Sequence, residues 1–109
     1  MTDDYRRYLE TTEFLDWQHD AVRGFVSSAI RGAADDITKA IGIFTAVRDS
    51  IWYDPYTVTD NPDAYRASTV ATSGRAYCVP KAVLLTAACR AAGIPARLGF
   101  ADVRNHLQT

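Results

Sequence analysis

The feature that most constrains the fold is residues 78–92, a stretch in which nearly every side chain is apolar or small. Its charged exceptions, Lys81 and Arg90, are nine positions apart, which places them roughly 180° apart around a helix axis. A helix that is apolar on almost all sides is buried and does not lie on a surface. Gly93 supplies a C-terminal stop, and Pro95 prevents continuation. The stretch therefore predicts a central helix enclosed by the rest of the domain.

Two amphipathic helices are predicted before the central helix, across residues 19–51. In the first, which ends at Gly32, apolar residues recur at three- and four-residue steps. They are Val22, Phe25, Val26, Ala29 and Ile30. The second begins at Asp35 and Asp36, acids that suit the positive end of a helix. Its expected buried stripe is Ile37, Ala40, Ile41, Phe44, Val47 and Ile51.

The remaining segments have weaker signals. Residues 1–18 have no steady period and are expected to form a leading arm, while residues 52–77 are rich in turn-forming residues and read as a loop, with one or two helical turns in 64–71. Residues 95–103 predict one strand. A chain of 109 residues that is 48% hydrophobic can bury one core, so residues 1–109 are expected to form a single α+β domain.

Charge and composition exclude several classes of partner. The formal net charge of −1 lacks the basic excess that nucleic acid favours, so no nucleic-acid partner is expected. No stretch approaches the roughly 18 apolar residues that span a bilayer, and the first residues do not resemble an export signal. We therefore expect a cytoplasmic protein without a membrane partner, in which both cysteines are free thiols.

Cys78 is the residue with the clearest chemical potential, because it is expected in the first turn of the central helix. Free backbone N–H groups and the helix dipole at this end stabilise a thiolate, the nucleophilic form of cysteine. The same N–H groups can donate to the oxyanion that forms when a thiolate attacks an amide carbonyl. Placement alone leaves open an inert cysteine that only fills space. Cys89, roughly 16 Å further along the helix, is expected to be such a packing residue.

Two segments carry a resemblance to a known family: GRAYCVPKAVLL at residues 74–85 and RAAGIPAR at residues 90–97. They resemble the cysteine motif of the transglutaminase-like superfamily. FLD at residues 14–16 and VRDSIWYD at residues 47–54 are similar to its bacterial members. The resemblance implies a papain-like cysteine proteinase fold in which a strand after the central helix leads into an antiparallel sheet. It also implies that Cys78 is the nucleophile in acyl transfer on peptide or protein amides, by a cysteine protease, amidase or transglutaminase that needs no cofactor.

Such a thiol needs a His oriented by an Asp or Asn. His19, at the start of the first helix, is expected to be structural. His106 is a candidate base and Asp102 a candidate orienting residue, because nearness in space governs such a pair. In the superfamily, however, the catalytic His is followed by an acid-bearing strand, whereas only three residues follow His106. We therefore expect a truncated domain, inactive alone, whose own His and Asp lie beyond residue 109.

A truncated sheet would leave one strand with open edges and the central helix without its usual cover. We therefore expect a homo-oligomer. Tyr77 and Trp52 are candidates for lining a substrate cleft, although aromatic residues at such positions more often fill a core. No metal site is expected, because Cys78 and Cys89 are too far apart along one helix to share a zinc ion. The alternative function is a non-catalytic transglutaminase-like module that mediates protein contacts.

Overall fold

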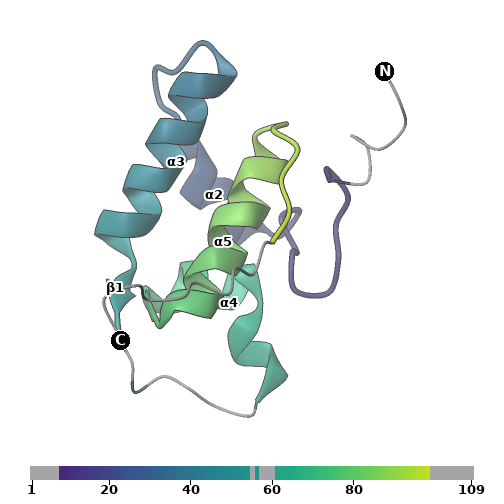
Figure 1. Cartoon of the computed structure of the whole chain (residues 1–109), viewed down its shortest axis with the longest axis vertical. Helices are drawn as coiled ribbons and strands as arrows, with labels where there is room; N and C mark the ends of the chain where they lie inside the picture. The colour runs from purple at the N-terminus through teal and green to yellow at the C-terminus, as the bar shows by residue number, and fades with distance from the viewer. Residues whose placement is uncertain (1–7, 55, 57–60, 99–109) are drawn as a thin grey trace, which may run out of the picture.

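The computed structural model describes residues 8–54, 56 and 61–98. Over these residues the chain forms four α-helices, one 3-10 helix and a two-stranded parallel sheet (Figure 1). In chain order they are α2 (Asp20–Ala29), α3 (Asp36–Ser50), β1 (Trp52–Tyr53), η2 (Pro62–Tyr65), α4 (Ala67–Ser73), β2 (Arg75–Ala76) and α5 (Cys78–Ala91). Within these ranges no helix is long and apolar enough to cross a bilayer.

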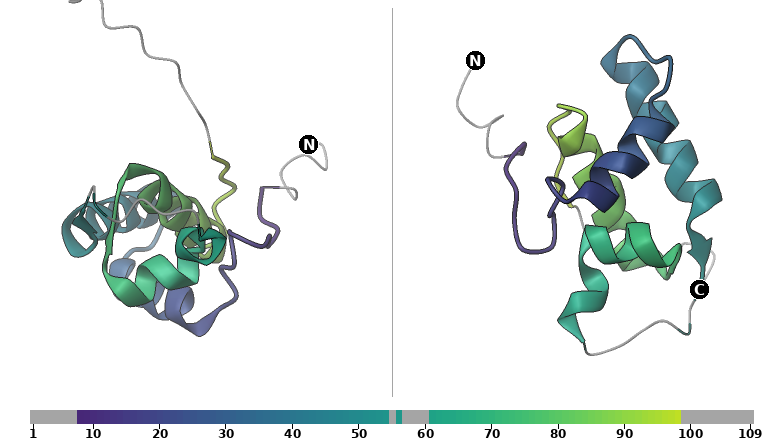
Figure 2. Two further views of the ribbon diagram at one scale, coloured as in Figure 1. Left: turned by 90° about the horizontal axis from the view of Figure 1, so that it is seen from below. Right: turned by 180° about the vertical axis from the view of Figure 1, so that it is seen from behind.

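Helix α5 is the centre of the fold, as its sequence predicted. It contacts α2, α3 and α4, and Figures 1 and 2 show these helices arranged around it. Its C-terminus has the hydrogen bonds of a Schellman cap, with the N–H of Gly93 donating to Arg90 O at 3.0 Å and that of Ile94 to Cys89 O at 2.8 Å. Gly93 has φ +84°, a left-handed conformation that favours glycine. The predicted stop is therefore where the helix ends.

Both predicted amphipathic helices are present, and a side chain caps each of them. The Nδ1 atom of His19 accepts a hydrogen bond from the N–H of Ala21, and Asp35 Oδ1 accepts one from the N–H of Thr38 at 2.7 Å. These contacts satisfy amide groups that a helix start leaves without partners. On α2 the buried residues are Val22 and Val26, which belong to the predicted stripe.

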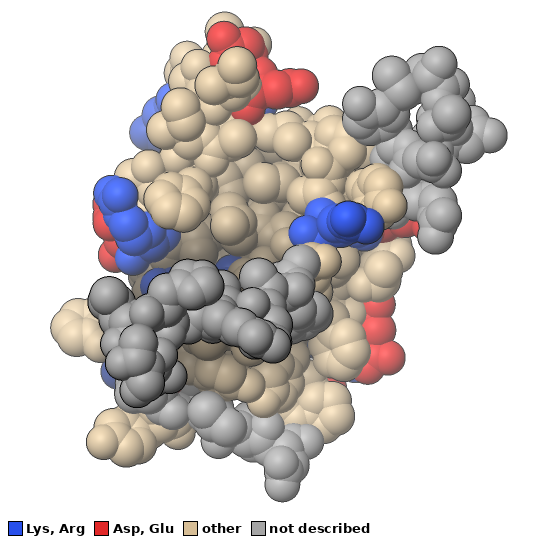
Figure 3. Space-filling view, in the orientation of Figure 1, with Lys and Arg blue, Asp and Glu red and all other residues tan. Residues whose placement is uncertain are grey.

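The predicted stripe of α3 is wrong in part. The side chains that face the core are Ile43 and Val47 of α3, followed by Ile51. Three members of the predicted stripe are instead exposed, Ile37 by 74%, Ile41 by 61% and Phe44 by 53%. Figure 3 shows the face over α3 and α5, where few charged side chains lie between the two helices. Helix α3 has enough apolar residues for two stripes, so periodicity alone could not select the buried one.

The rotation of α3 is explained by Gly42. A Cβ atom at this position would lie 2.5 Å from the carbonyl oxygen of Ala29, at the end of α2. Because a real Cβ atom cannot approach a backbone oxygen so closely, only glycine allows this contact. The contact turns the side of α3 that carries Gly42 and Ile43 toward α2. The stripe on the opposite side, which begins at Ile37, consequently faces outward.

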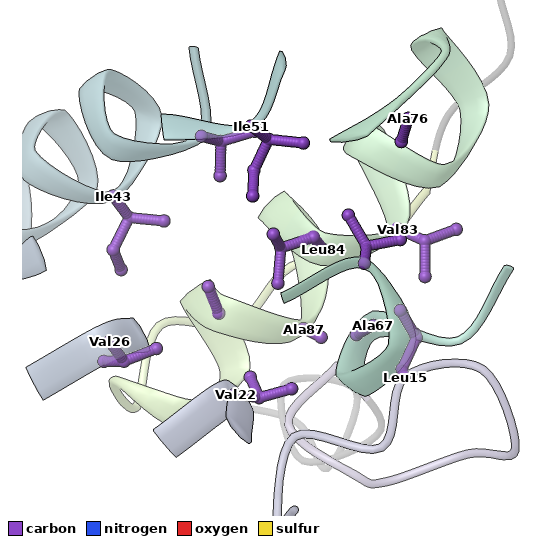
Figure 4. Packing of buried hydrophobic residues seen from close by; sticks show 13 residues of the cluster. Leu15, Val22, Val26, Ile43, Ile51, Ala67, Ala76, Val83, Leu84 and Ala87 are labelled. Carbon is purple, nitrogen blue, oxygen red and sulfur yellow. The ribbon is translucent and has the colours of Figure 1, made fainter. Parts of the chain in front are cut away.

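The core consists mainly of β-branched residues, leucine and alanine. Leu84, Ala87 and Ala88 of α5 are each 0% exposed. In Figure 4 the side chains of α2 and α3 approach α5 from two directions and surround Leu84. Small residues on α5 let neighbouring helices approach closely, so a short chain can still bury its central helix.

Residues 52–77 are more regular than the predicted loop. They contain β1, η2, α4 and β2, and β1 pairs with β2 in parallel, with Trp52 opposite Arg75. Strands of two residues have no alternating pattern that a sequence analysis could detect. One or two helical turns were expected in 64–71. The later residues of this range belong to α4, in which Ala67 and Val70 are buried.

The leading arm has no helix or strand between residues 8 and 18, as predicted, but it is anchored to α4. The carboxylate of Asp16 accepts hydrogen bonds from the N–H and the Oγ–H of Ser68, and the N–H of Ala67 donates to Phe14 O at 2.9 Å. Leu15 is buried in the core. A segment far away in the sequence thus caps a helix that has no capping side chain of its own at Arg66.

The strand predicted at residues 95–103 is not found in its described part. Residues 95–98 have no strand conformation, and the rest of that range lies outside the described residues. The N–H of Ala96 instead donates to the carbonyl of Tyr8 at 3.0 Å, in the leading arm. The Arg97 guanidinium also lies 5.7 Å from the centre of the Tyr8 ring. The segment after α5 is therefore held by the arm.

Candidate active site

Cys78 is the first residue of α5, and its side chain is exposed. Tyr77 is the N-cap, with extended backbone angles of φ −87° and ψ −172°, and no side chain makes a capping hydrogen bond there. The helix ladder starts with the bond from Lys81 N–H to Tyr77 O at 3.2 Å. The amides of Cys78 and Val79 therefore lie in the first turn, where N–H groups have no acceptor within the helix. The thiol thus lies at the electropositive tip of a buried helix, as the sequence predicted.

The small parallel sheet fixes the backbone that leads to Cys78. The N–H of Trp52 donates to Gly74 O at 2.8 Å, and that of Asp54 donates to Ala76 O at 3.0 Å. Gly74, with φ +72°, ends α4 in the left-handed conformation and turns the chain into β2. Ala76 is buried. Because β1 follows α3 directly, the position of the thiol is tied to the packing of α3.

Two tyrosines form a pair directly beside the nucleophile candidate. The hydroxyl oxygens of Tyr65 and Tyr77 are 2.6 Å apart, and their rings meet edge to face at 6.0 Å with an interplanar angle of 87°. The hydrogen bond with Tyr65, followed by desolvation and the negative charges of Tyr65 and Cys78, raises the pKa of Tyr77 to about 12. Tyr77 therefore stays protonated at neutral pH. The pair joins η2 to the N-cap of α5.

The cations near the thiol have acidic neighbours. The Nη1 atom of Arg75 lies 3.6 Å from Oδ2 of Asp54, across the small sheet. Lys81, one turn after Cys78, contributes to lowering the pKa of Asp49, although the main cause of that shift is the hydrogen bond from Arg48. Within the described residues, the helix tip favours a thiolate without depending on these two cations, whose charges also act on Asp54 and Asp49.

Cys89 has the opposite environment from Cys78. It is partly buried in the last turn of α5, and burial raises the pKa of its thiol. Both cysteines are free, as expected from their separation along the helix. The two thiols thus provide a reactive candidate and an internal reference within one helix.

The structure does not join a described histidine to the thiol. His19 caps α2, and the hollow of about 340 Å³ beside it is lined by α4 residues, without Cys78. Its structural role is confirmed. His106 and Asp102 lie outside the described residues. Among the residues that are described, no group of three or more His, Cys, Asp or Glu side chains could hold a metal ion.

The two aromatic cleft candidates have different environments. Trp52 is 74% exposed, so it does not fill the core, whereas Tyr77 is partly buried in its pair with Tyr65. Tyr65 was not identified from the sequence. The available signal was its position three residues after Pro62, within the turn that Asn61 and Pro62 start; in the structure the Asn61 side chain caps η2.

A central helix with an exposed thiol at its tip and a strand that fixes the preceding backbone define a domain suited to present a cysteine nucleophile. The sequence profile of the transglutaminase-like superfamily matches residues 23–108, and the chain belongs to this superfamily. This membership confirms the resemblance of the cysteine motif and implies a papain-like fold and, in general, thiol-dependent chemistry on amide bonds. Searches among curated proteins and among solved structures found no match.

Proposed function

We propose that this protein uses Cys78 in thiol-dependent acyl transfer on peptide or protein amides. The observation that carries the proposal is the exposed thiol at a helix start that no side chain caps. The superfamily supports this general chemistry, and either water or an amine can be the final acceptor.

In the proposed first step, the Cys78 thiolate forms a C–S bond to the amide carbonyl carbon. The developing oxyanion accepts hydrogen bonds from N–H groups of the first turn of α5. The C–N bond then breaks, and the leaving amine takes a proton from a general acid. The resulting thioester transfers its acyl group to water, which gives hydrolysis, or to an amine, which gives transamidation.

The proton donor and acceptor in this proposal is a histidine in the chain that follows α5. His106 is the candidate within this sequence, with Asp102 as the residue that orients it. Trp52, exposed on the strand opposite Arg75, is the candidate for contacting the substrate near the thiol.

The proposal predicts that Cys78 reacts faster in the folded protein than in the unfolded chain. At about pH 6.5, well below the ordinary thiol pKa of about 8.5, we expect iodoacetamide to label it about tenfold faster in buffer than in urea. Unfolding only increases access to the thiol, so exposure cannot produce this result. The rates are measured by mass-spectrometric peptide mapping.

Cys89 is the control within the same chain. Because burial both shields it and raises its pKa, it should react more slowly in buffer than in urea. If Cys78 also reacts no faster in buffer than in urea, the thiol is not activated and the enzymatic proposal is wrong. The alternative, a non-catalytic module for protein contacts, is then favoured.

We also propose that the chain forms a homodimer through the exposed stripe of α3. Ile37, Ile41 and Phe44 follow one another at helical spacing, and beside them lies a hollow of about 240 Å³ between α3 and α5. In an antiparallel pair of α3 helices, Asp36 at the start of one would approach Arg48 at the end of the other. The two helix dipoles would also be antiparallel, an arrangement in which they attract each other.

The dimer can be tested by light scattering across a concentration series. We expect the mass to approach that of two chains, and Ile41→Glu to give monomers because it places a charge in the apolar contact. Ser27→Glu, on the exposed side of α2, should dimerise like the unchanged protein. A monomer at every concentration would exclude the proposed pairing.

A further inference from the structure

Beyond the nucleophile, the structure assigns a positioning role to Tyr65, and we infer that its hydroxyl holds Tyr77 so that α5 presents Cys78 correctly. The inference rests on the proposed function, because it concerns how the same thiol is presented. It does not make Tyr65 catalytic, since the hydroxyl bonds to Tyr77.

Two contacts between the tyrosines act on the same residue. The hydroxyl groups bond at 2.6 Å, and the edge-to-face ring contact at 6.0 Å holds the Tyr77 side chain in a second direction. Tyr65 is the last residue of η2, whose first turn is capped by Asn61. A segment more than ten residues upstream in the sequence therefore fixes the side chain of the N-cap.

Tyr77 is also part of the backbone that starts the helix. Its carbonyl accepts the bond from Lys81 N–H, and the next residue is Cys78. No side-chain cap holds this helix start, so β2 before it and the Tyr77 side chain are the contacts that hold the N-cap itself, next to the packing of the helix that follows. Loss of the Tyr65 contact should thus allow Tyr77 to move and change the direction of the first-turn N–H groups at the thiol.

The electrostatic properties of the pair agree with this role. The charge of Cys78 is among the causes that raise the Tyr77 pKa, so the two side chains lie within electrostatic reach of each other. Tyr77 stays neutral when the thiol ionises, and a neutral hydroxyl pair does not repel the thiolate. The other charged groups around this helix start, Lys81, Arg75 and Asp54, remain unchanged when only a tyrosine hydroxyl is removed.

The experiment compares Tyr65→Phe, Tyr77→Phe and the double variant with the unchanged protein. Each single variant keeps its ring and loses the same hydrogen bond. We expect Cys78 labelling at about pH 6.5 to slow about threefold or more in each, corresponding to one hydrogen bond. Since the two hydroxyls act through a shared bond, the double variant should be no slower than either single one.

Two further measurements separate positioning from general loosening. Labelling of Cys89 should not change, whereas a loosened fold would expose it and speed its reaction. In Tyr65→Phe, the spectroscopic titration of Tyr77 should move down from about 12 toward the ordinary tyrosine range, because the main cause of its raised pKa is gone. Tyr56→Phe, at a side chain that is 94% exposed, serves as the matched control and should behave like the unchanged protein.

The possible failures can be told apart. If Cys78 of the unchanged protein is activated and Tyr65→Phe labels at the same rate, the positioning role is excluded while the proposed function stands. A double variant whose Cys78 is labelled as fast as in the unchanged protein would also exclude the shared bond. So would a loss of labelling rate in the double variant that equals both single losses combined, because it would show two independent effects. If Cys78 of the unchanged protein reacts no faster than in urea, the proposed function fails, and the inference that rests on it fails too.

Discussion

Replacing Arg90 by methionine should lower the free energy of unfolding by about 3 kcal/mol. Arg90 is 7% exposed, and its Nε and Nη1 atoms each donate to a backbone carbonyl at 2.7 Å, Ala96 O and Glu10 O. Methionine keeps the apolar stem but removes both charge-assisted hydrogen bonds. It also removes a positive charge from the last turn of α5, where the helix dipole favours one. Urea denaturation followed by circular dichroism measures the change.

The matched control for this substitution is Arg23→Met, on the exposed side of α2. A surface change of this kind should stay within about 0.5 kcal/mol. In Arg90→Met the amide of Ala96, which bonds to Tyr8, should also exchange its hydrogen faster, because the arm and the segment after α5 lose their shared anchor. A stability loss below about 1 kcal/mol would show that the buried guanidinium does not hold these segments together.

Gly42→Ala is expected to destabilise the fold by about 2 kcal/mol or more. Alanine is ordinarily the better helix former by about 1 kcal/mol, so the expected loss runs against intrinsic propensity. The reason is the added Cβ atom, which would lie 2.5 Å from Ala29 O. Both atoms belong to or are fixed by the backbone, so relief requires a shift of α3 away from α2.

Gly24→Ala is the control for Gly42→Ala. Gly24 is exposed within α2, and a Cβ atom there would meet nothing within 4 Å. This substitution should stabilise the protein by about 0.5–1 kcal/mol, because alanine loses less conformational entropy on folding. Opposite signs for the same chemical change, measured by thermal unfolding, would confirm that backbone contact decides the effect. A stabilised Gly42→Ala variant would contradict the close approach of α2 and α3.

The helices could be predicted from the sequence because apolar periodicity and end signals agree for α2 and α5. The orientation of α3 could not, because it depends on the contact of Gly42 with Ala29, which only the packed structure reveals. The two strands were also missed. Each has two residues, and they owe their conformation to pairing with each other across more than twenty positions.

The location of Cys78 at a helix tip was predictable because both the apolar run that follows it and the motif around it are local. The groups that hold Cys78 in place could not be predicted from the sequence. The sheet that holds its backbone and the Tyr65 hydroxyl that contacts its neighbour come from distant segments. Similarly, Arg90 was seen only as a charge interrupting an apolar run. Its partners are carbonyl groups, which leave no trace in the identities of the residues that carry them.

The contact of Tyr8 with Ala96 joins the two ends of the described part of the chain. It therefore closes nearly all of the described residues into one loop, and Arg90 reinforces the closure by donating to Glu10 O and Ala96 O. The entropic cost of closing a loop grows only slowly with its length, so this long closure costs little more than a short one.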